Sequence, residues 1–548
     1  MKTPLSTSTS HVDFSTKTIL IIDDYHAMRS IFRDMLRASG ADSKKISTAA
    51  NGNEAISLLS KKQFDVVLCD FNLGPGKNGQ QVLEEAKYKG LVELSCIWVM
   101  ITAEKTSDAV AGAAEYQPDA YLLKPVTEAV LSHRLNKVWE KKRTLSEIHQ
   151  AIKQLKFSKA IDLCDECLTS DKANAADFLR IKYDLLLQSG ELDRAKALLE
   201  DILIEREFPW AKVGLANIFF KSNNLDEAKA LLEETIEMNS SFLEAYDLLA
   251  KIFLATGDLE GASKTLGQAL KLSPNSVVRQ KSFGDVVLKM GKAEDAERAF
   301  RKSVSLGENS VLKMADAYIG LAKACSANSH NGEALKALGQ LNKNFTTDDV
   351  RLKAIAVEGI VHHQSGDDEK AKGIAIELSE LLAKTDVEPD SDRSLEMARL
   401  FIVTGDKERA IELLQNEVRS NPENTTLLDD VAEVFVHADM GEEGAKLIEG
   451  SRKEALEIMN RGVLLVKEGQ YEEAISAMRN ARKAMPSNVR VLLNLAYVFI
   501  THFQKNGSTP ELVKEARDSL LAANALSPGE SRFTKLMGSL NEFASSND

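Results

Sequence analysis

The feature that most constrains this chain is a sequence pattern that returns about every 34 residues over most of its length. An alanine marks each copy. The clearest copies carry it at positions 160, 195, 228, 262 and 296, which are 35, 33, 34 and 34 residues apart. Looser copies follow at positions 334, 371, 410, 445, 474 and 516. A period of this length predicts an array of similar supersecondary units, each stacked on its neighbours, rather than one globular core.

Two further positions indicate that each unit is a pair of antiparallel helices. A small residue lies twelve positions before the repeated alanine, as at Ala216, Ala250 and Gly284. A proline lies twelve positions after it in several copies, as at Pro274 and Pro422. Two helices approach closely only where both carry small side chains. Because proline cannot continue a helix, it ends the second helix and starts the link to the next unit.

The first part of the chain has a different pattern, in which short apolar runs alternate with amphipathic stretches. The apolar runs cover residues 18–22, 46–49, 65–69, 95–101 and 120–123, and the second of them is the weakest. Alternation of strands and helices is typical of an α/β domain with a parallel sheet. We therefore expect five parallel strands in this part of the chain, followed by an all-α repeat region.

Polar side chains follow the predicted strands at the points where the strands end. Asp23 and Asp24 end the first strand, Asp70 ends the third, Thr102 ends the fourth, and Lys124 follows the fifth. In parallel sheets, ligand chemistry gathers at this edge. Three carboxylates together suit a hard cation such as Mg²⁺. A carboxylate beside that cation can attack a phosphoryl group, while a lysine and a hydroxyl offset the charge on its oxygens.

This constellation resembles the receiver domain of bacterial response regulators, including the single-domain chemotaxis type, over residues 18–140. The resemblance implies a flavodoxin-like, doubly wound fold. It also implies that Asp70 is the phosphoacceptor. Asp24 would bind Mg²⁺ directly and Asp23 through water, with Asp70 and the backbone carbonyl of Asn72 as further ligands.

The same resemblance assigns roles to the remaining polar positions. Thr102 would bind the phosphoryl group through its hydroxyl, and Lys124 would pair with it. Tyr121 occupies the position of the family's switch aromatic, although a partly buried strand aromatic is the alternative interpretation. Asn72 and Glu104 lie two residues beyond the phosphoacceptor and the hydroxyl, where side chains of this family modulate dephosphorylation.

The period of about 34 residues resembles the tetratricopeptide repeat, and we assign residues 148–540 to about ten or eleven copies. The resemblance implies a superhelix whose concave surface binds a protein segment, and it transfers no catalytic residue. Asn217 and Asn494 are candidates for holding the backbone of such a partner, with ordinary solvated helix positions as the alternative.

Two short segments complete the expected organisation. Residues 1–17 are rich in serine and threonine and have no periodicity, so we expect a flexible tail. Residues 141–147 contain no glycine or proline. We therefore expect a helical linker there, which would couple the two parts more rigidly than a glycine–serine linker.

Charge and composition exclude several classes of function. The chain holds 69 Lys and Arg against 82 Asp and Glu, a net charge of −13. The acidic excess lies after residue 143 and repels phosphate backbones, so we expect no nucleic-acid partner. There is no run of about 18 apolar residues and no secretion signal, so we expect no membrane partner. An odd count of five cysteines favours a reducing cytoplasm.

The sequence favours a two-component response regulator, a phosphoprotein in a phosphorelay. A sensor histidine kinase would phosphorylate Asp70, and the repeat arm would bind a protein that the sequence does not identify. We expect no enzymatic output beyond the receiver's own phosphorylation and dephosphorylation. The main alternative is a phosphate sink or inhibitor acting on a kinase. A DNA-binding transcriptional regulator is less favoured because no basic recognition helix is evident.

Overall fold

The structure is a computed structural model that describes residues 13–93, 95–103, 118–385, 390–527 and 531–545. The chain divides into two compact units, Met1–Ala317 and Tyr318–Asp548. None of the helices within the described ranges combines the length and the apolar character that crossing a membrane requires.

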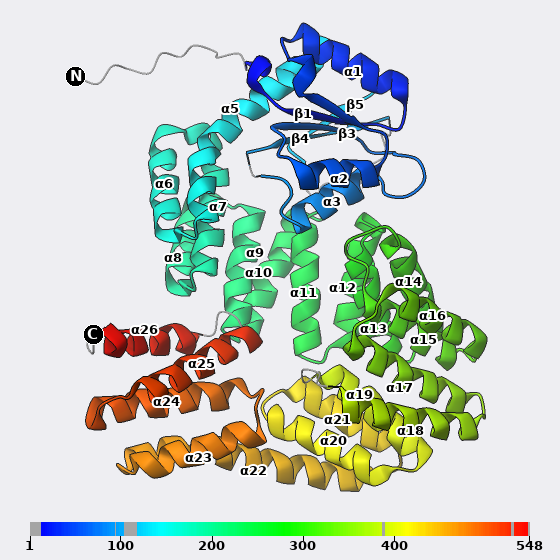
Figure 1. The fold of residues 1–548 in the computed structure, drawn as a ribbon, viewed down its shortest axis with the longest axis vertical. Helices are drawn as coiled ribbons and strands as arrows, with labels where there is room; N and C mark the ends of the chain where they lie inside the picture. Colours follow the sequence, from blue (N-terminus) through cyan, green and yellow to red (C-terminus); the bar gives the residue numbers. More distant parts are fainter. Residues whose placement is uncertain (1–12, 94, 104–117, 386–389, 528–530, 546–548) are drawn as a thin grey trace. The chain divides into compact units, whose positions relative to one another are not determined.

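The first unit begins with a five-stranded sheet (Figure 1). The strands are β1 (Ile19–Ile22), β2 (Ile46–Ala49), β3 (Val66–Asp70), β4 (Ile97–Thr102) and β5 (Ala120–Leu123). They lie in the order β2-β1-β3-β4-β5, and every neighbouring pair is parallel. The predicted five-stranded parallel sheet is therefore confirmed.

Helices cover both faces of this sheet. The described helices are α1 (His26–Ala38), α2 (Gly52–Lys61), α3 (Gly79–Tyr88) and α5 (Glu128–Lys153). α1 and α5 contribute to the core on one face, while α2 and α3 contribute to the core on the other. This is the doubly wound arrangement that the alternating pattern predicts.

The alternation of side chains along β1 explains why two cores form. Ile19 and Ile21 point into the core beneath α1 and α5, and Leu20 and Ile22 point into the core beneath α2 and α3. All four side chains are at most 1% exposed. A strand buried on both faces reads as a continuous apolar run, because successive side chains point to opposite sides.

We expected residues 1–17 to form a flexible tail, but the last of these residues are folded. Residues 1–12 lie outside the described residues, but Phe14–Thr16 form a short 3-10 helix. Phe14 is only 3% exposed and packs in the core beneath α1 and α5. Lys17 lies 4.0 Å from the ring centre of Trp139. The tail was predicted from composition, and this reasoning overlooked Phe14, which packs in the core.

Helical hairpins follow α5 in the first unit. Their helices are α6 (Phe157–Ser170), α7 (Ala175–Gln188), α8 (Leu192–Glu205), α9 (Pro209–Lys221), α10 (Leu225–Met238), α11 (Leu243–Ala255), α12 (Leu259–Leu272), α13 (Val277–Lys289) and α14 (Ala293–Gly307). The repeated alanines at 160, 195, 228, 262 and 296 are all 0% exposed. Gly257 and Gly291 have φ of +75° and +74° in the turns after α11 and α13, a conformation that ends helices. The predicted helical repeats are confirmed.

The same hairpins continue beyond α15 (Ala315–Ala327), which spans the boundary between the units. The helices of the second unit are α16 (Asn331–Asn344), α17 (Asp348–Gln364), α18 (Asp368–Lys384), α19 (Ser391–Thr404), α20 (Lys407–Ser420), α21 (Thr425–His437), α22 (Gly441–Lys467), α23 (Tyr471–Ala484), α24 (Val489–Asn506), α25 (Pro510–Leu526) and α26 (Ser531–Ser545). The repeated alanines at 334, 371, 410, 474 and 516 are again 0% exposed. The copy assigned to position 445 is out of register by one residue, because Ala445 is exposed and the buried Gly444 takes the place of the repeated alanine.

Helix α22 departs from the hairpin pattern because it runs for 27 residues without a break. It combines the second helix of one repeat with the first helix of the next. The copies marked by Ala410 and Ala474 carry prolines twelve residues later, at Pro422 and Pro486, whereas the copy marked by residue 445 has a glutamate there. The missing proline permits a longer helix but does not cause one, because α10 ends at Met238 although the copy marked by Ala228 has Ser240 at this position.

Candidate metal and phosphoryl site

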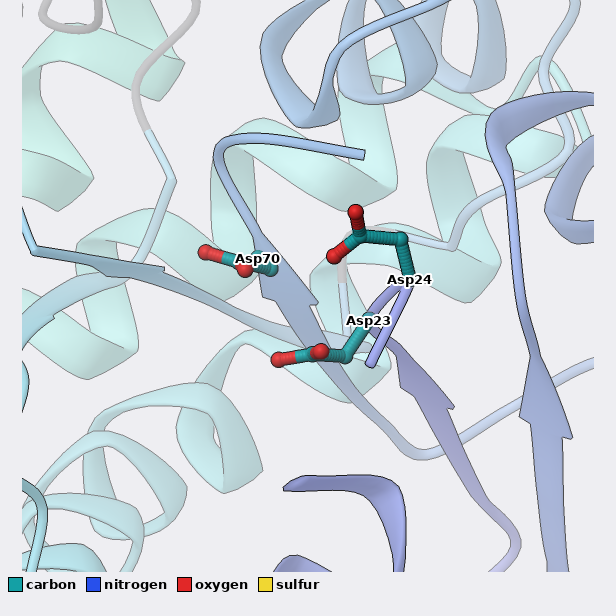
Figure 2. A group of neighbouring side chains, drawn as sticks. All are labelled: Asp23, Asp24 and Asp70. Atoms are coloured by element: carbon teal, nitrogen blue, oxygen red, sulfur yellow. The ribbon is translucent and has the colours of Figure 1, made fainter. Parts of the chain in front are cut away.

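Three aspartates meet at the carboxyl end of the sheet, as Figure 2 shows. Asp23 and Asp24 directly follow β1, and Asp70 is the last residue of the neighbouring strand β3. Each side chain offers a carboxylate oxygen, and these oxygens lie within 4.8 Å of one another. Asp23 is 1% exposed and Asp70 is 8% exposed, while Asp24 is exposed. The three side chains that the sequence singled out are therefore together.

Lys124 joins two of these carboxylates from the loop after β5. Its Nζ lies 2.8 Å from Oδ2 of Asp70 and 3.1 Å from Oδ2 of Asp23. The Lys124 amide also donates to the carbonyl of Thr102, at 2.8 Å. Since Thr102 ends β4 and is only 5% exposed, the ends of β4 and β5 are held at the same site.

The protonation states follow from burial and from this ion pair. Burial raises the pKa of Asp70, and the hydrogen bond and charge of Lys124 offset part of that rise. Burial acts to lower the pKa of Lys124, but its hydrogen bonds to Asp70 and Asp23 outweigh this effect and raise the pKa. Lys124 therefore keeps its positive charge. Burying the negative charge of Asp70 would be costly without a positive partner beside it.

The donor set fits Mg²⁺. Three carboxylates face one lysine, so the cluster retains negative charge, and all its donors are oxygens. Asp23 is fixed by two contacts with the start of the following helix. Its Oδ1 accepts from the Tyr25 amide at 2.8 Å, and its carbonyl accepts from Nη1 of Arg29 at 2.6 Å. The exposed residue Asn72 lies two positions beyond Asp70, on the loop after β3.

Tyr121 lies in the middle of β5 and pairs with Met100 of β4. It packs against the core beneath α2 and α3, and its buried hydroxyl has no hydrogen-bond partner within the described part of the chain. Burial raises the pKa of this hydroxyl. The placement fits both interpretations of Tyr121, so its switch role stays a prediction. The candidate Glu104 lies outside the described residues.

Two residues of the site were missed from the sequence. Arg29 faces the carbonyl of Asp23 from the first turn of α1. Gly79 begins α3 so close to β3 that an added Cβ would lie 2.1 Å from the carbonyl oxygen of Asp70. The glycine-rich loop before α3 was a signal for such a close approach.

One of the two candidate groove residues of the repeats has structural contacts. Asn494 is 3% exposed, donates to the carbonyl of Met459 at 2.8 Å and accepts from Arg532 at 2.9 Å. It therefore ties α24 to its neighbours and does not face a partner. Asn217 is half-buried on α9, and its role in binding a partner stays a prediction.

Comparisons with known proteins agree with both parts of the chain. Residues 19–136 match the family model of the response regulator receiver domain. Models of the tetratricopeptide repeat match residues 186–252, 243–276 and 459–531.

Similar proteins include two chemotaxis proteins. CheY-3 of Vibrio cholerae is 35% identical over 124 residues, which are 22% of this chain and 92% of that protein. CheY of Pseudomonas aeruginosa is 31% identical over 123 residues, 22% of this chain and 96% of that protein.

Among solved structures, YrrB is described as a tetratricopeptide repeat protein with an unusual peptide-binding site. It aligns with 39% of this chain and 96% of its own at 17% identity, with a TM-score of 0.30. The matched residues 19–136 include every candidate site residue, from Asp23 to Lys124. The chain therefore belongs, through its first domain, to the response regulator receiver family, and it carries tetratricopeptide repeats in its C-terminal region.

Proposed function

We propose that this protein is a cytoplasmic phosphorelay response regulator. A sensor histidine kinase phosphorylates Asp70, and the phosphoryl state controls protein binding by the repeat arm. The observation that carries the proposal is the position of Lys124, whose Nζ contacts both Asp70 and Asp23 at the carboxyl end of the sheet. The proposal assigns no other reaction to the chain and no nucleic-acid partner.

The chemistry follows from the geometry of the site. A carboxylate oxygen of Asp70 attacks the phosphorus of the phosphohistidine, the phosphorus–nitrogen bond breaks, and the imidazole leaves with the electron pair. Lys124 and the Thr102 hydroxyl bind oxygens of the transferred group. Asp23, Asp24, Asp70 and the carbonyl of Asn72 would hold Mg²⁺, which supplies positive charge against those oxygens. Asn72 and Glu104 would tune the later attack of water.

The repeat arm offers a groove that suits a protein segment. A cavity of about 1180 Å³ lies along α21 and α22 in the second unit. Its apolar lining includes Leu428, Ile448 and Leu456, and its charged lining includes Arg452 and Arg461. A groove lined by apolar and charged side chains suits an extended or helical peptide.

A continuous helix supports coupling between the receiver and the repeats. α5 runs from Glu128 in the receiver to Lys153, next to the first described hairpin helix α6. Ile148 and Ala151 of α5 are buried among the side chains of α6 to α9. A movement of α5 therefore moves the packing surface of the first repeats.

Lys142 ties α5 to the two strands that carry the switch residues. Its Nζ lies 2.7 Å from Oδ2 of Asp119 and donates to the carbonyl of Cys96. Oδ2 of Asp119 also accepts from the Trp98 amide at 2.7 Å. These groups lie where β4 and β5 begin, and Thr102 ends β4. In this proposal, a displacement of these strands at the phosphoryl end reaches α5 through the Lys142 contacts at their opposite ends.

We expect Lys142→Met to separate phosphorylation from its effect on the repeats. Loading wild-type protein with beryllofluoride and Mg²⁺ should change amide hydrogen exchange in α6, because α5 follows β4 and β5. The variant should load equally but show less than about a third of the change in α6, since losing a partly buried ion pair removes roughly 1–3 kcal/mol of coupling. Hydrogen exchange with mass spectrometry measures both regions.

Lys153→Met is the matched control for this experiment. Lys153 pairs with Glu93 at 2.6 Å, but its side chain is 53% exposed, whereas that of Lys142 is 13% exposed. Exposed pairs contribute little, so this variant should respond like the wild type. An undiminished response in Lys142→Met would contradict the coupling through α5.

The output is tested by capture of partner proteins with the full-length chain. The wild type loaded with beryllofluoride should retain a different amount of partner than loaded Asp70→Asn. Equal capture by both proteins would favour a phosphate sink over a regulated adaptor.

A further inference from the structure

The receiver helix α3 contacts the repeats at a second place, far along the chain from α5. The contact is made by residues 306–314, which are the last two residues of α14 and the link to α15 and which we call the 306–314 segment. Oγ of Ser310 donates to Oε1 of Glu84 at 2.7 Å. Nε2 of Gln81 donates to the carbonyl of Leu306 at 3.3 Å. Both contacts lie within the first compact unit.

Burial shows that this contact covers the outer side of α3. Val82, Leu83 and Ala86 face the sheet and form its core. Glu84 follows Leu83 by one residue, so it points about 100° away from it. Even so, Glu84 is only 7% exposed, and its partner Ser310 is 8% exposed. A glutamate is rarely buried without a partner, and here the 306–314 segment provides one.

The repeat sequence contains an insertion at this place. Successive alanines of the clear copies lie 33 to 35 residues apart, but Ala296 and Ala334 lie 38 residues apart. Three of the four extra residues fall in the link between α14 and α15, and the fourth lengthens α14. The structure places this link against α3. The Leu312 amide donates to Oγ of Ser310 at 2.9 Å, and this bond orients the hydroxyl toward Glu84.

The start of α3 connects this contact to the phosphoacceptor. The Gly79 amide donates to the carbonyl of Phe71, the residue after Asp70, at 2.8 Å. Gln81 and Asn78 form a capping box, in which Oε1 of Gln81 accepts from the Asn78 amide at 3.1 Å. The side-chain amide of Gln81 therefore makes both contacts. Its oxygen closes the first turn of α3, and its nitrogen donates to the carbonyl of Leu306.

We propose that the 306–314 segment is a built-in docking surface for the receiver helix α3, and that the phosphoryl state of Asp70 controls how tightly it is occupied. Loading of Asp70 moves the loop from residue 71 to 78, the capping box shifts with it, and the two hydrogen bonds to the segment weaken. A contact built on a few hydrogen bonds opens and closes readily, as a switch requires. The control by phosphorylation rests on the proposed function, whereas the docking itself does not.

The docking is tested by hydrogen exchange on the full-length chain. Ser310→Ala should raise the exchange rate of the α3 amides by about tenfold, because the substitution removes a hydrogen bond to a buried carboxylate in a different domain. Glu84→Gln retains the size of the side chain and should raise exchange in the 306–314 segment by a smaller factor. Ser305→Ala, at an exposed position of α14, is the matched control and should change neither region.

Unchanged exchange of α3 in Ser310→Ala would overturn the docking. The control by phosphorylation has its own readout. Beryllofluoride should raise exchange in the 306–314 segment of the wild type and leave Asp70→Asn unaffected. If Ser310→Ala behaves as expected but beryllofluoride changes nothing in the segment, the docking stands and its control by Asp70 is refuted. If the wild type cannot be loaded at all, the proposed function itself fails.

Discussion

Asparagine in place of Asp70 is expected to abolish labelling of the full-length protein by radioactive acetyl phosphate. The amide cannot attack phosphorus, and it also removes one of the three carboxylates that face Lys124. Loss of a covalent nucleophile lowers rates by roughly 1000-fold or more. The measurement is the initial rate of label incorporation in the presence of Mg²⁺, followed on a gel.

Asp65→Asn supplies the matched control for Asp70→Asn. Asp65 directly precedes β3, at the opposite end from Asp70, and it accepts from the amide and the hydroxyl of Thr18, both at 2.8 Å. The same chemical change there leaves all three site carboxylates in place, so labelling should continue. Label on Asp70→Asn at a rate near that of the wild type would refute Asp70 as the phosphoacceptor.

The second large effect is expected for Gly79→Ala. A Cβ at this position would lie 2.1 Å from the carbonyl oxygen of Asp70 and 3.0 Å from Sγ of Cys69. The nearer atom belongs to the backbone of a buried strand, so it cannot move aside as a flexible side chain would. We expect a loss of about 3 kcal/mol in the stability of the receiver, together with slower labelling of the displaced Asp70.

Hydrogen exchange of the β3 amides reports this loss directly, because unfolding of a chain with several units does not yield one free energy. Gly339→Ala is the matched control. Gly339 lies inside α16, and an added Cβ there meets nothing within 4 Å. Alanine in an open helical position should be neutral or stabilise by up to about 1 kcal/mol. Equal exchange of β3 in Gly79→Ala and the wild type would disprove the steric argument.

The sequence was sufficient to find the site because parallel strands end at one edge of a sheet. Asp23, Asp70, Thr102 and Lys124 could each be assigned to a strand end, and the structure brings them together. The contact of Arg29 with the carbonyl of Asp23 was not predictable, since it depends on the angle at which α1 leaves the strand.

In the repeats, the small residues predicted which helices pair, but not what each polar side chain contacts. Asn494 faces Met459 and Arg532 because α24 packs against helices on more than one side. A period of 34 residues gives no information about that packing. The unbroken α22 could not be inferred from the missing proline at residue 457, because α8 and α10 end although Glu207 and Ser240 take that position in their copies. The contact of Glu84 with Ser310 joins positions 226 residues apart, and no local pattern predicts it.

The unbroken helix α22 has a mechanical consequence. A helix of 27 residues is about 40 Å long and bends far less easily than a turn. Repeats joined by turns adjust to a ligand by small rotations at these turns, so the array as a whole is flexible. α22 is a stiff connection within the second unit. A force on the hairpins on one side of it is therefore transmitted to the hairpins on the other side.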